Sequence, residues 1–346
     1  MSSMKKLIIF QTWGIGDMIM TTPMLRALRQ QSPELHITVV VASPSAAAAI
    51  GGSDLCDEVR ICSLHTGSIW EIFRFFLHVR AGHFDVAIIA TRLSPRIALL
   101  LRALTKIAVI AGDGVGPRSW GYTHWRQIDR SKHRVMENLA ILRLLYPEAP
   151  ILEPYFHLDE IARDEAERIW TINRLAGGIV LGIHPGSAEI ECKEKRLPVE
   201  LCKKIITEFL AALPAGRILL FFGPDDQDVQ LAFKTPDTRV VSIDRLNLRT
   251  VGALIEKCHV FLNGDAGLGH IAAAVGVPVV TVAGPTDMRQ TRPWGTGHSV
   301  VTTQKPLACM PCYDTKLYGN CPYACECIRT IPAHDVFQKV SQALRG

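Results

Sequence analysis

The glycine-rich segment 263–270, NGDAGLGH, most constrains the fold because it joins two short apolar runs. Residues 260–262 and 278–283 have the composition of buried strands, and the small residues at 271–275 suit a helix. This order predicts a strand, a glycine turn and a helix start. Backbone amides and the positive helix end then point toward the carboxyl edge of a sheet, where they bind anions, most simply phosphate.

Several residues of this stretch are candidates for contacts to a phosphorylated sugar. Gly267 and Gly269 let a ligand approach the backbone. Asp265 is suited to accept from sugar hydroxyls, and His270 to donate to a phosphate oxygen. Thr286 closes a second turn at the same sheet edge, so we expect both turns to face one cleft. The alternative is a structural β–α–β unit in which these glycines only serve turns.

The N-terminal part repeats the order of strand, glycine turn and helix. Residues 7–12 are strand-like, and residues 18–28 have helical spacing. The third glycine of the dinucleotide fingerprint is missing and the strand at 36–42 ends without a carboxylate, which disfavours an NAD enzyme. Asp17, at the helix start, is either a helix cap or a general base at the cleft mouth.

Segment 92–134 carries nine Lys or Arg residues against two Asp, interleaved with glycines and aromatic residues. This composition suits a loop that grips an anionic partner such as phosphorylated lipid, nucleic acid or acidic polysaccharide, although such a surplus is often only a solvated face. We expect no nucleic acid, because tandem RNA-binding signatures are missing. The candidate acceptor-binding residues are Arg92, Arg96, Arg118, Lys132 and Arg134.

The second half begins a new strand series after Gly177 and Gly178, where we place the join between two doubly wound α/β halves. Lys195 lies about ten residues beyond the first strand end and is placed to reach a diphosphate, unless it is a plain surface lysine. Asp226 follows the strand at 217–222. A carboxylate at this position is placed to bind the diol of a ribose, and the alternative is that it only stabilises the local turn.

Composition narrows the class of protein. A chain of 346 residues that is 48% hydrophobic supports two domains. No apolar run reaches the roughly 18 residues that span a membrane, and the start lacks a signal-peptide cleavage site, so we expect a cytoplasmic protein. Five of the ten cysteines crowd into residues 309–327, whereas the others are scattered.

Four ordered motifs resemble one family, the heptosyltransferases of the lipopolysaccharide inner core, glycosyltransferase family 9. Its pattern is matched by GDMIMTTP at 16–23, HPGS at 184–187 with KRLP at 195–198, DAGLGHIAAAVGVP at 265–278, and GPTD at 284–287. The resemblance implies a GT-B fold, in which two Rossmann-like, doubly wound lobes face one cleft.

The resemblance also implies domain roles. Residues 1–160 are expected to form the acceptor-binding lobe and residues 175–330 the nucleotide-sugar-binding lobe. The helix expected within residues 331–346 should pack back on the first lobe, as in similar folds.

The activity implied by the resemblance is inverting transfer of a heptose from ADP-heptose to a hydroxyl of a phosphorylated lipid core, with no cofactor for catalysis. Asp17 matches the general base and Asp265 the sugar-binding carboxylate. Lys195 matches a phosphate contact, Asp226 loosely an acid on the adenosine ribose, and Gly267 with His270 the diphosphate loop. Ala266 departs from the family's usual Ser or Thr, which removes one hydroxyl contact to phosphate.

The cysteine cluster resembles an element found in many members of the family. A CxxC pair with further thiolates suits a closed, structural Zn or Fe site in the second lobe. We expect Cys325 to be spare, and disulfides or free thiols are the alternative. The expected ligands are Cys309, Cys312, Cys321 and Cys327.

Three other functions compete with this interpretation. A protein acceptor, such as an autotransporter, would replace the lipid core. A nucleotide-sugar epimerase would release product without an acceptor, and a non-catalytic RNA-binding protein would use the basic segment and the cysteines. A lipid acceptor further implies peripheral contact with the inner membrane.

Overall fold

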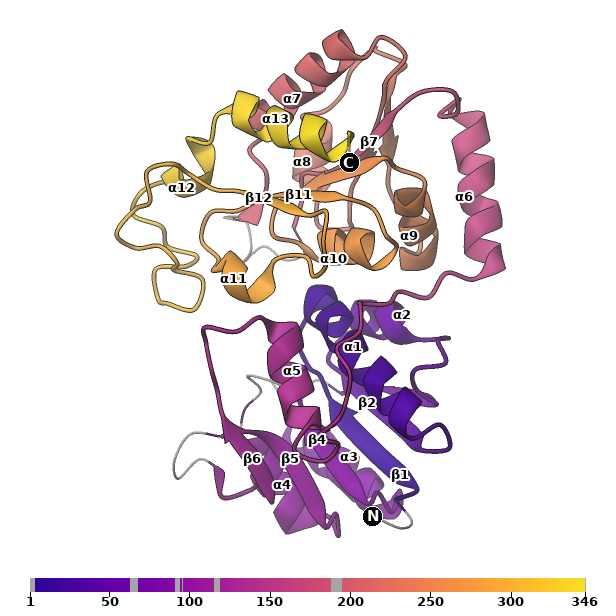
Figure 1. The fold of residues 1–346 in the computed structure, drawn as a ribbon, viewed down its shortest axis with the longest axis vertical. Helices are drawn as coiled ribbons and strands as arrows, with labels where there is room; N and C mark the ends of the chain where they lie inside the picture. The colour runs from indigo at the N-terminus through magenta and orange to yellow at the C-terminus, as the bar shows by residue number, and fades with distance from the viewer. Residues whose placement is uncertain are drawn as a thin grey trace. The chain divides into compact units, whose positions relative to one another are not determined.

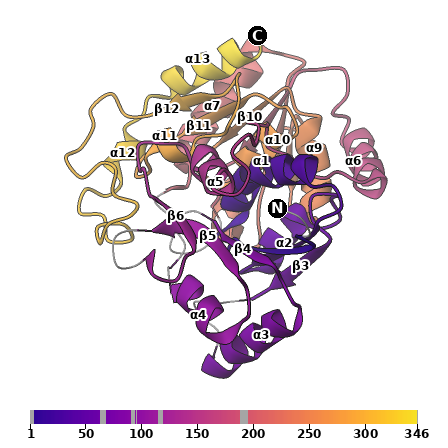
Figure 2. The same cartoon turned by 60° about the horizontal axis from the view of Figure 1, so that its bottom comes forward.

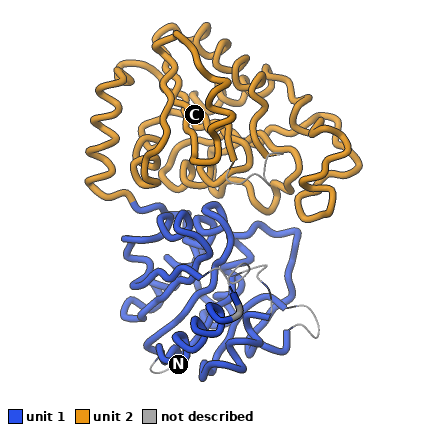
Figure 3. The backbone as a smooth tube through the Cα atoms, turned by 180° about the vertical axis from the view of Figure 1, so that it is seen from behind, with its two compact units in different colours: residues 1–157 blue, residues 158–346 orange. Residues whose placement is uncertain are grey.

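The computed structural model describes residues 4–62, 68–90, 94, 96–114, 119–187 and 195–345. The chain divides into two compact units, residues 1–157 and 158–346 (Figure 3). Each unit holds a parallel sheet with flanking helices (Figure 1), which confirms the predicted α/β class with two doubly wound lobes. The described residues contain no helix that is both long and apolar enough to cross a membrane.

Among its described residues, unit 1 has a six-stranded sheet in the order β3-β2-β1-β4-β5-β6, with every pair parallel. β1 pairs with β2 on one side and β4 on the other, so the strand order reverses there, where open α/β sheets bind ligands. The strands are β1 (Lys6–Phe10), β2 (His36–Val41), β3 (Glu58–Ile61), β4 (Val86–Ile89), β5 (Val109–Gly114) and β6 (His124–Gln127).

The helices of unit 1 are α1 (Ile15–Gln31), α2 (Pro44–Ile50), α3 (Ile69–Ala81), α4 (Arg96–Leu104) and α5 (Arg134–Leu142). α3 begins with a capping box, in which Ser68 and Glu71 satisfy each other's backbone amides. α3 and α4 bury Phe76 and Leu101 against Phe10 of β1 in one core cluster. α1 packs beside α5, which brings the residues after β1 close to those after β6.

Unit 2 repeats this topology with the described strand order β12-β11-β10-β7-β8-β9, again wholly parallel. The order reverses at β7, beside β10. The strands are β7 (Val180–His184), β8 (Arg217–Phe221), β9 (Val240–Ile243), β10 (Val260–Asn263), β11 (Val279–Val282) and β12 (Ser299–Val301). The helices are α6 (Glu160–Ile172), α7 (Val199–Ala212), α8 (Gln227–Leu231), α9 (Leu248–Glu256), α10 (Gly267–Ala274), α11 (Met288–Thr291), α12 (Glu326–Arg329) and α13 (Ala333–Ala343).

The C-terminal helix packs differently from the prediction. α13 lies beside α7 (Figure 1), and its Val336 and Val340 are buried in the core of unit 2. The expectation that it packs back on the first lobe was therefore wrong. The apolar i, i+4 spacing of Val336 and Val340 gives α13 one apolar face, but such a spacing carries no information about which core covers that face.

The boundary between the units also falls earlier than the glycine pair suggested. The division follows His157, and α6 belongs to unit 2. Polar contacts tie α6 to α9: Arg249 Nη1 donates to Asp159 Oδ2 over 2.7 Å, and Lys257 Nζ donates to Glu167 Oε2 over 2.6 Å. Charged residues of α6 and its N-cap thus take part in packing this helix against α9.

Candidate functional site

The side chains of Lys195 and Asp265 form a nearly buried ion pair in unit 2. Lys195 Nζ lies 2.8 Å from Asp265 Oδ2, and the two side chains are 11% and 9% exposed. Asp265 follows β10, and Lys195 comes after the neighbouring strand β7. The structure therefore brings together two predicted donor-binding residues at the point where the strand order of unit 2 reverses.

The charge of Asp265 is stabilised by its neighbours. Burial, the largest single influence, would raise the pKa of this carboxyl, but Lys195, His270 and Thr286 together outweigh it, so the pKa lies below its ordinary value. His270 is itself buried, on the first turn of α10. Asp265, His270 and Thr286 therefore form one polar group with Lys195, and their role in donor binding stays a prediction.

The start of α10 is suited to an anion. The helix begins at Gly267, and its N-cap residue Ala266 makes no side-chain capping hydrogen bond. The first backbone amides of a helix have no partner within the helix, and the helix dipole adds partial positive charge. The predicted diphosphate loop thus presents amide donors next to Lys195.

Two glycines of this region are explained by close packing. A Cβ at Gly264 would overlap the backbone carbonyl of Lys195, and a Cβ at Gly269 would overlap the side chain of Asn263. Asn263 in turn accepts from Thr281 Oγ1 over 3.2 Å. Gly269 therefore makes room for Asn263, which differs from the expected role of letting a ligand approach.

Asp226 joins two loops inside unit 2. Its carboxylate accepts from the backbone amides of Ser187 at 3.2 Å and Gly223 at 2.8 Å, and it is only 2% exposed. Arg196 lies 3.6 Å away. The carboxylate is thus engaged in holding the HPGS turn against the turn after β8, and its assignment to a ribose stays a prediction.

The cysteine-rich segment contacts the donor residues, a relationship that spacing did not reveal. The amides of Cys312 and Tyr313 donate to the carbonyl of Pro285 over 2.9 and 3.1 Å. The Tyr313 ring lies under Lys195, with Nζ 3.6 Å from the ring centroid. The sequence did not indicate this role of Tyr313, because a tyrosine next to a cysteine does not by itself predict a contact with a lysine.

The thiols of this segment are neighbours. Burial raises the pKa of Cys327 to about 11, and the thiols of Cys312, Cys321 and Cys309 add to this rise. Burial also raises the pKa of Cys312, as do Cys309 and Cys321. The nine cysteines within the described ranges are all free thiols. Among the residues that the structure describes, no group of three or more His, Cys, Asp or Glu side chains is arranged so that it could hold a metal ion.

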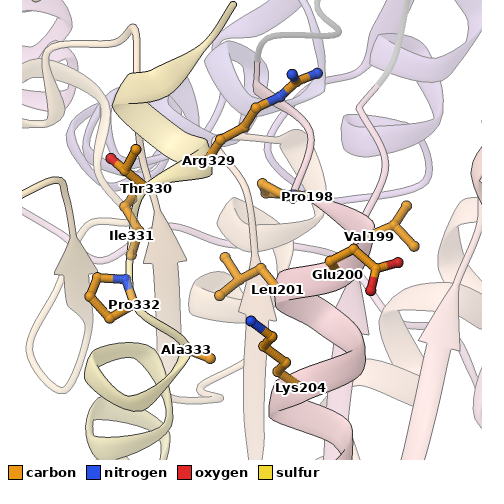
Figure 4. A pocket seen from close by; sticks show the side chains of 10 residues that line it. All are labelled: Pro198, Val199, Glu200, Leu201, Lys204, Arg329, Thr330, Ile331, Pro332 and Ala333. Carbon is orange, nitrogen blue, oxygen red and sulfur yellow. The ribbon is translucent and has the colours of Figure 1, made fainter.

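A pocket elsewhere in unit 2 is lined by other residues than those described above. It lies between the start of α7 and the turn from α12 to α13, with Lys204 and Arg329 among its lining residues (Figure 4). None of the predicted donor-binding residues lines it. We therefore place the candidate site at the Lys195–Asp265 pair.

In unit 1, Asp17 pairs with Arg134. Arg134 Nη1 donates to Asp17 Oδ1 over 2.8 Å, and the side chains are 10% and 25% exposed for Arg134 and Asp17. Gly14 is the N-cap of α1, so Asp17 is a first-turn residue and the capping interpretation does not hold. Behind it, Thr21 Oγ1 donates to the Asp17 carbonyl and accepts from Asn138.

The other predicted acceptor-binding residues lie on the same sheet edge or outside the described residues. Arg96 begins α4 after β4, and Lys132 precedes α5 after β6; both are exposed. Arg134 is buried and donates to Asp17. Arg92 and Arg118 lie outside the described residues.

Comparison with known proteins decides the family. Residues 72–320 match the model of glycosyltransferase family 9 (heptosyltransferase). The chain belongs to glycosyltransferase family 9. It is therefore a glycosyltransferase, as the motifs predicted. Lipopolysaccharide heptosyltransferase 3 of Escherichia coli K12 is 25% identical over 295 residues, which cover 81% of this chain and 82% of that protein.

Solved structures share the fold. A glycosyl transferase family 9 protein from Veillonella parvula superposes with a TM-score of 0.82 at 20% identity, covering 100% of this chain and 98% of the other. The ADP-heptose lps heptosyltransferase II of E. coli superposes with a TM-score of 0.73 at 21% identity, covering 99% of each chain. Both likenesses support the two-lobed architecture of the family.

Proposed function

We propose that this glycosyltransferase moves a heptose from ADP-heptose to a hydroxyl of a lipopolysaccharide core acceptor. The observation that carries the proposal is the Lys195–Asp265 pair beside the N-terminus of α10. A lysine, helix amides and a buried histidine suit a diphosphate, and a buried carboxylate suits sugar hydroxyls. The names of the E. coli relatives support the heptose and the ADP.

In the proposed reaction, the acceptor oxygen attacks the anomeric carbon of the donor from the face opposite the diphosphate. The carboxylate of Asp17, oriented by Arg134, takes the acceptor hydroxyl proton. The bond between the anomeric carbon and the diphosphate oxygen breaks with inversion, and ADP leaves with the electron pair. Lys195, His270 and the α10 amides stabilise the negative charge that develops on ADP.

The acceptor is proposed to be a phosphorylated lipid core at the inner membrane. The exposed Arg96 and Lys132 supply positive charge at the same sheet edge as Asp17. Arg134 serves Asp17 instead. A bound diphosphate would share the Lys195 ammonium group with Asp265.

The cysteine cluster is proposed to hold a structural Zn or Fe ion through Cys309, Cys312, Cys321 and Cys327. The support is chemical: all four are free thiols, the neighbouring thiols help to raise the pKa of Cys312 and Cys327, and thiolates suit both metals. Such an ion would tie down the segment that carries Tyr313, and it takes no part in the transfer.

Thermal unfolding with ADP, UDP, GDP, CDP and ADP-heptose tests the donor. A ligand at about 100 times its Kd stabilises the folded state by about 2.7 kcal/mol. A shift selective for ADP and ADP-heptose is expected. A shift with UDP or GDP instead would remove heptose from the proposal, and no shift with any nucleotide would contradict a nucleotide-sugar site.

Transfer itself is tested with ADP-heptose and purified core lipopolysaccharide that lacks its heptose. Release of ADP together with a heptosylated core is the expected result. Product formed without an acceptor would indicate an epimerase, and transfer only to an autotransporter fragment would indicate a protein acceptor.

A further inference from the structure

Helices α3 and α4 of unit 1 expose large apolar side chains to solvent. On α3, Trp70, Phe73 and Leu77 are 74%, 40% and 46% exposed. On α4, Leu99 and Leu100 are 47% and 37% exposed. Figure 2 shows the two helices side by side, and they pack against each other. We call these five side chains the α3–α4 face.

The apolar side chains of this face are additional to those that build the core. The inner sides of the two helices already bury Phe76 and Leu101. Trp70, Phe73 and Leu77 recur at i, i+3 and i+7, so they form one stripe on the solvent-exposed side of α3. A stripe of large exposed apolar residues at this spacing indicates an interaction surface rather than scattered surface residues.

A third aromatic residue adjoins the face. Trp120 is 75% exposed. Its neighbour Gly121 lies so close to α4 that a Cβ there would meet the backbone of Ala98 and Leu99. The chain beside the exposed Trp120 therefore packs against α4.

Positive charge surrounds this apolar surface. The two helices carry four arginines, Arg74, Arg80, Arg96 and Arg102, and a single carboxylate, Glu71. The carboxylate of Glu71 accepts from the Ser68 amide over 2.7 Å in the cap of α3. Arg74 and Arg80 are exposed and follow Trp70 and Leu77 by one helical turn, so both charges flank the stripe.

We propose that the α3–α4 face docks on an anionic lipid bilayer. Tryptophan and phenylalanine enter the headgroup region of a membrane, while flanking arginines are attracted to anionic headgroups. A second copy of the chain fits less well, because two such faces would bring their arginines together. This proposal does not rest on the proposed transfer reaction, although a lipid-linked acceptor would be reached from such a surface.

The test is co-sedimentation of the full chain with phosphatidylcholine vesicles, with and without phosphatidylglycerol, in the absence of donor and acceptor. Binding to the phosphatidylglycerol vesicles that weakens with added salt is expected. The variant with Trp70→Ser and Phe73→Ser should bind at least about tenfold less. The variant with Arg74→Gln and Arg80→Gln should lose about thirtyfold, at about 1 kcal/mol per arginine.

A matched control removes exposed apolar groups elsewhere. Ile161 and Ile172 on α6 are 79% and 65% exposed, and their double replacement by serine should leave vesicle binding unchanged. The proposal would be overturned if this control lost as much vesicle binding as the α3 variants, or if the wild-type chain did not bind the vesicles. So would an α3 variant that keeps vesicle binding but loses self-association in analytical ultracentrifugation. The vesicle assay contains no nucleotide sugar, so its failure would leave the transferase proposal standing.

Discussion

Lys195 lies over the ring of Tyr313, with its ammonium nitrogen 3.6 Å from the ring centroid. Asp265 approaches the same nitrogen at 2.8 Å. The lysine therefore has a carboxylate and an aromatic face as partners, and the aromatic face comes from the cysteine-rich segment. This contact links the donor residues to a part of the chain for which the sequence indicated only a metal site.

Replacing Tyr313 with leucine should weaken ADP binding. A cation–π contact contributes about 0.5–2 kcal/mol, so the Kd for ADP should rise by between about twofold and thirtyfold, while Tyr313→Phe stays near wild type. Calorimetric titration measures the Kd. Tyr323→Leu, in the same segment and 42% exposed, is the control and should bind ADP normally. An unchanged Kd in Tyr313→Leu would show that Tyr313 does not position the lysine.

The ion pair between Lys195 and Asp265 should behave as a coupled, buried pair. Removal of one partner leaves the other charge buried, so Lys195→Met or Asp265→Asn alone should cost about 3–5 kcal/mol of unfolding free energy. The double variant should cost clearly less than the sum. Urea unfolding of the four proteins gives the coupling energy. The exposed pair Lys203–Glu200, treated in the same way, should couple by less than about 1 kcal/mol.

Asp17→Asn should slow transfer without affecting the donor. Loss of a general base costs about 10²–10⁴ in rate, whereas the predicted ADP contacts belong to unit 2. Steady-state kinetics with core acceptor and titration with ADP measure the two effects separately. Asp54→Asn, at an exposed position of unit 1, should keep the wild-type rate. A rate for Asp17→Asn within about tenfold of wild type would exclude its role as base.

Stability should fall between neutral pH and about pH 5.5 because of buried histidine. Burial lowers the pKa of His184, partly opposed by the Asp226 carboxylate, while Arg196 also lowers it. Burial lowers the pKa of His298 as well. A histidine with a depressed folded-state pKa binds its proton first in the unfolded chain. The contribution of such a histidine to the free energy of unfolding is therefore complete above the unfolded-state pKa of about 6.5, and it is lost as the pH falls below that value.

His184→Asn tests this pH dependence. Asparagine has a side-chain donor for the Phe221 carbonyl, which the His184 ring contacts at 3.0 Å, but it does not titrate. Melting temperatures at pH 7.5 and 5.5 should differ less in the variant than in the wild type. The pKa of Asp265 is lowered in the folded protein, so this residue affects stability in a separate, more acidic pH range. Its contribution to the free energy of unfolding is lost as the pH falls below about 4. An unchanged pH difference in His184→Asn would contradict the assignment.

Protein purified anaerobically should contain about one equivalent of Zn or Fe. Cys312→Ser and Cys327→Ser should lose the metal and lower the melting temperature, because metal binding stabilises the folded segment. Cys325→Ser is a matched control in the same cluster and should retain the metal. Elemental analysis showing far less than one equivalent in the wild type would remove the metal site.

Much of the fold was predictable because it depends on local patterns. Apolar runs such as those of β7 and β10 alternate with helical spacing, and turns follow the strands, which is enough to predict parallel sheets. Parallel strands share one carboxyl edge, so Lys195 and Asp265 were predicted at the same edge. The placement of α13 was not predictable, because an amphipathic pattern specifies a buried face and not its partner.

The sequence by itself determined the two α/β halves, the family and the sheet edges that carry the candidate residues. Only the tertiary structure decided the partners of these residues: Arg134 for Asp17, 117 positions apart, and Tyr313 for Lys195. The reason is physical. Secondary structure follows from spacing along the chain, whereas ion pairs, cation–π contacts and burial depend on side chains that only the packed fold brings together.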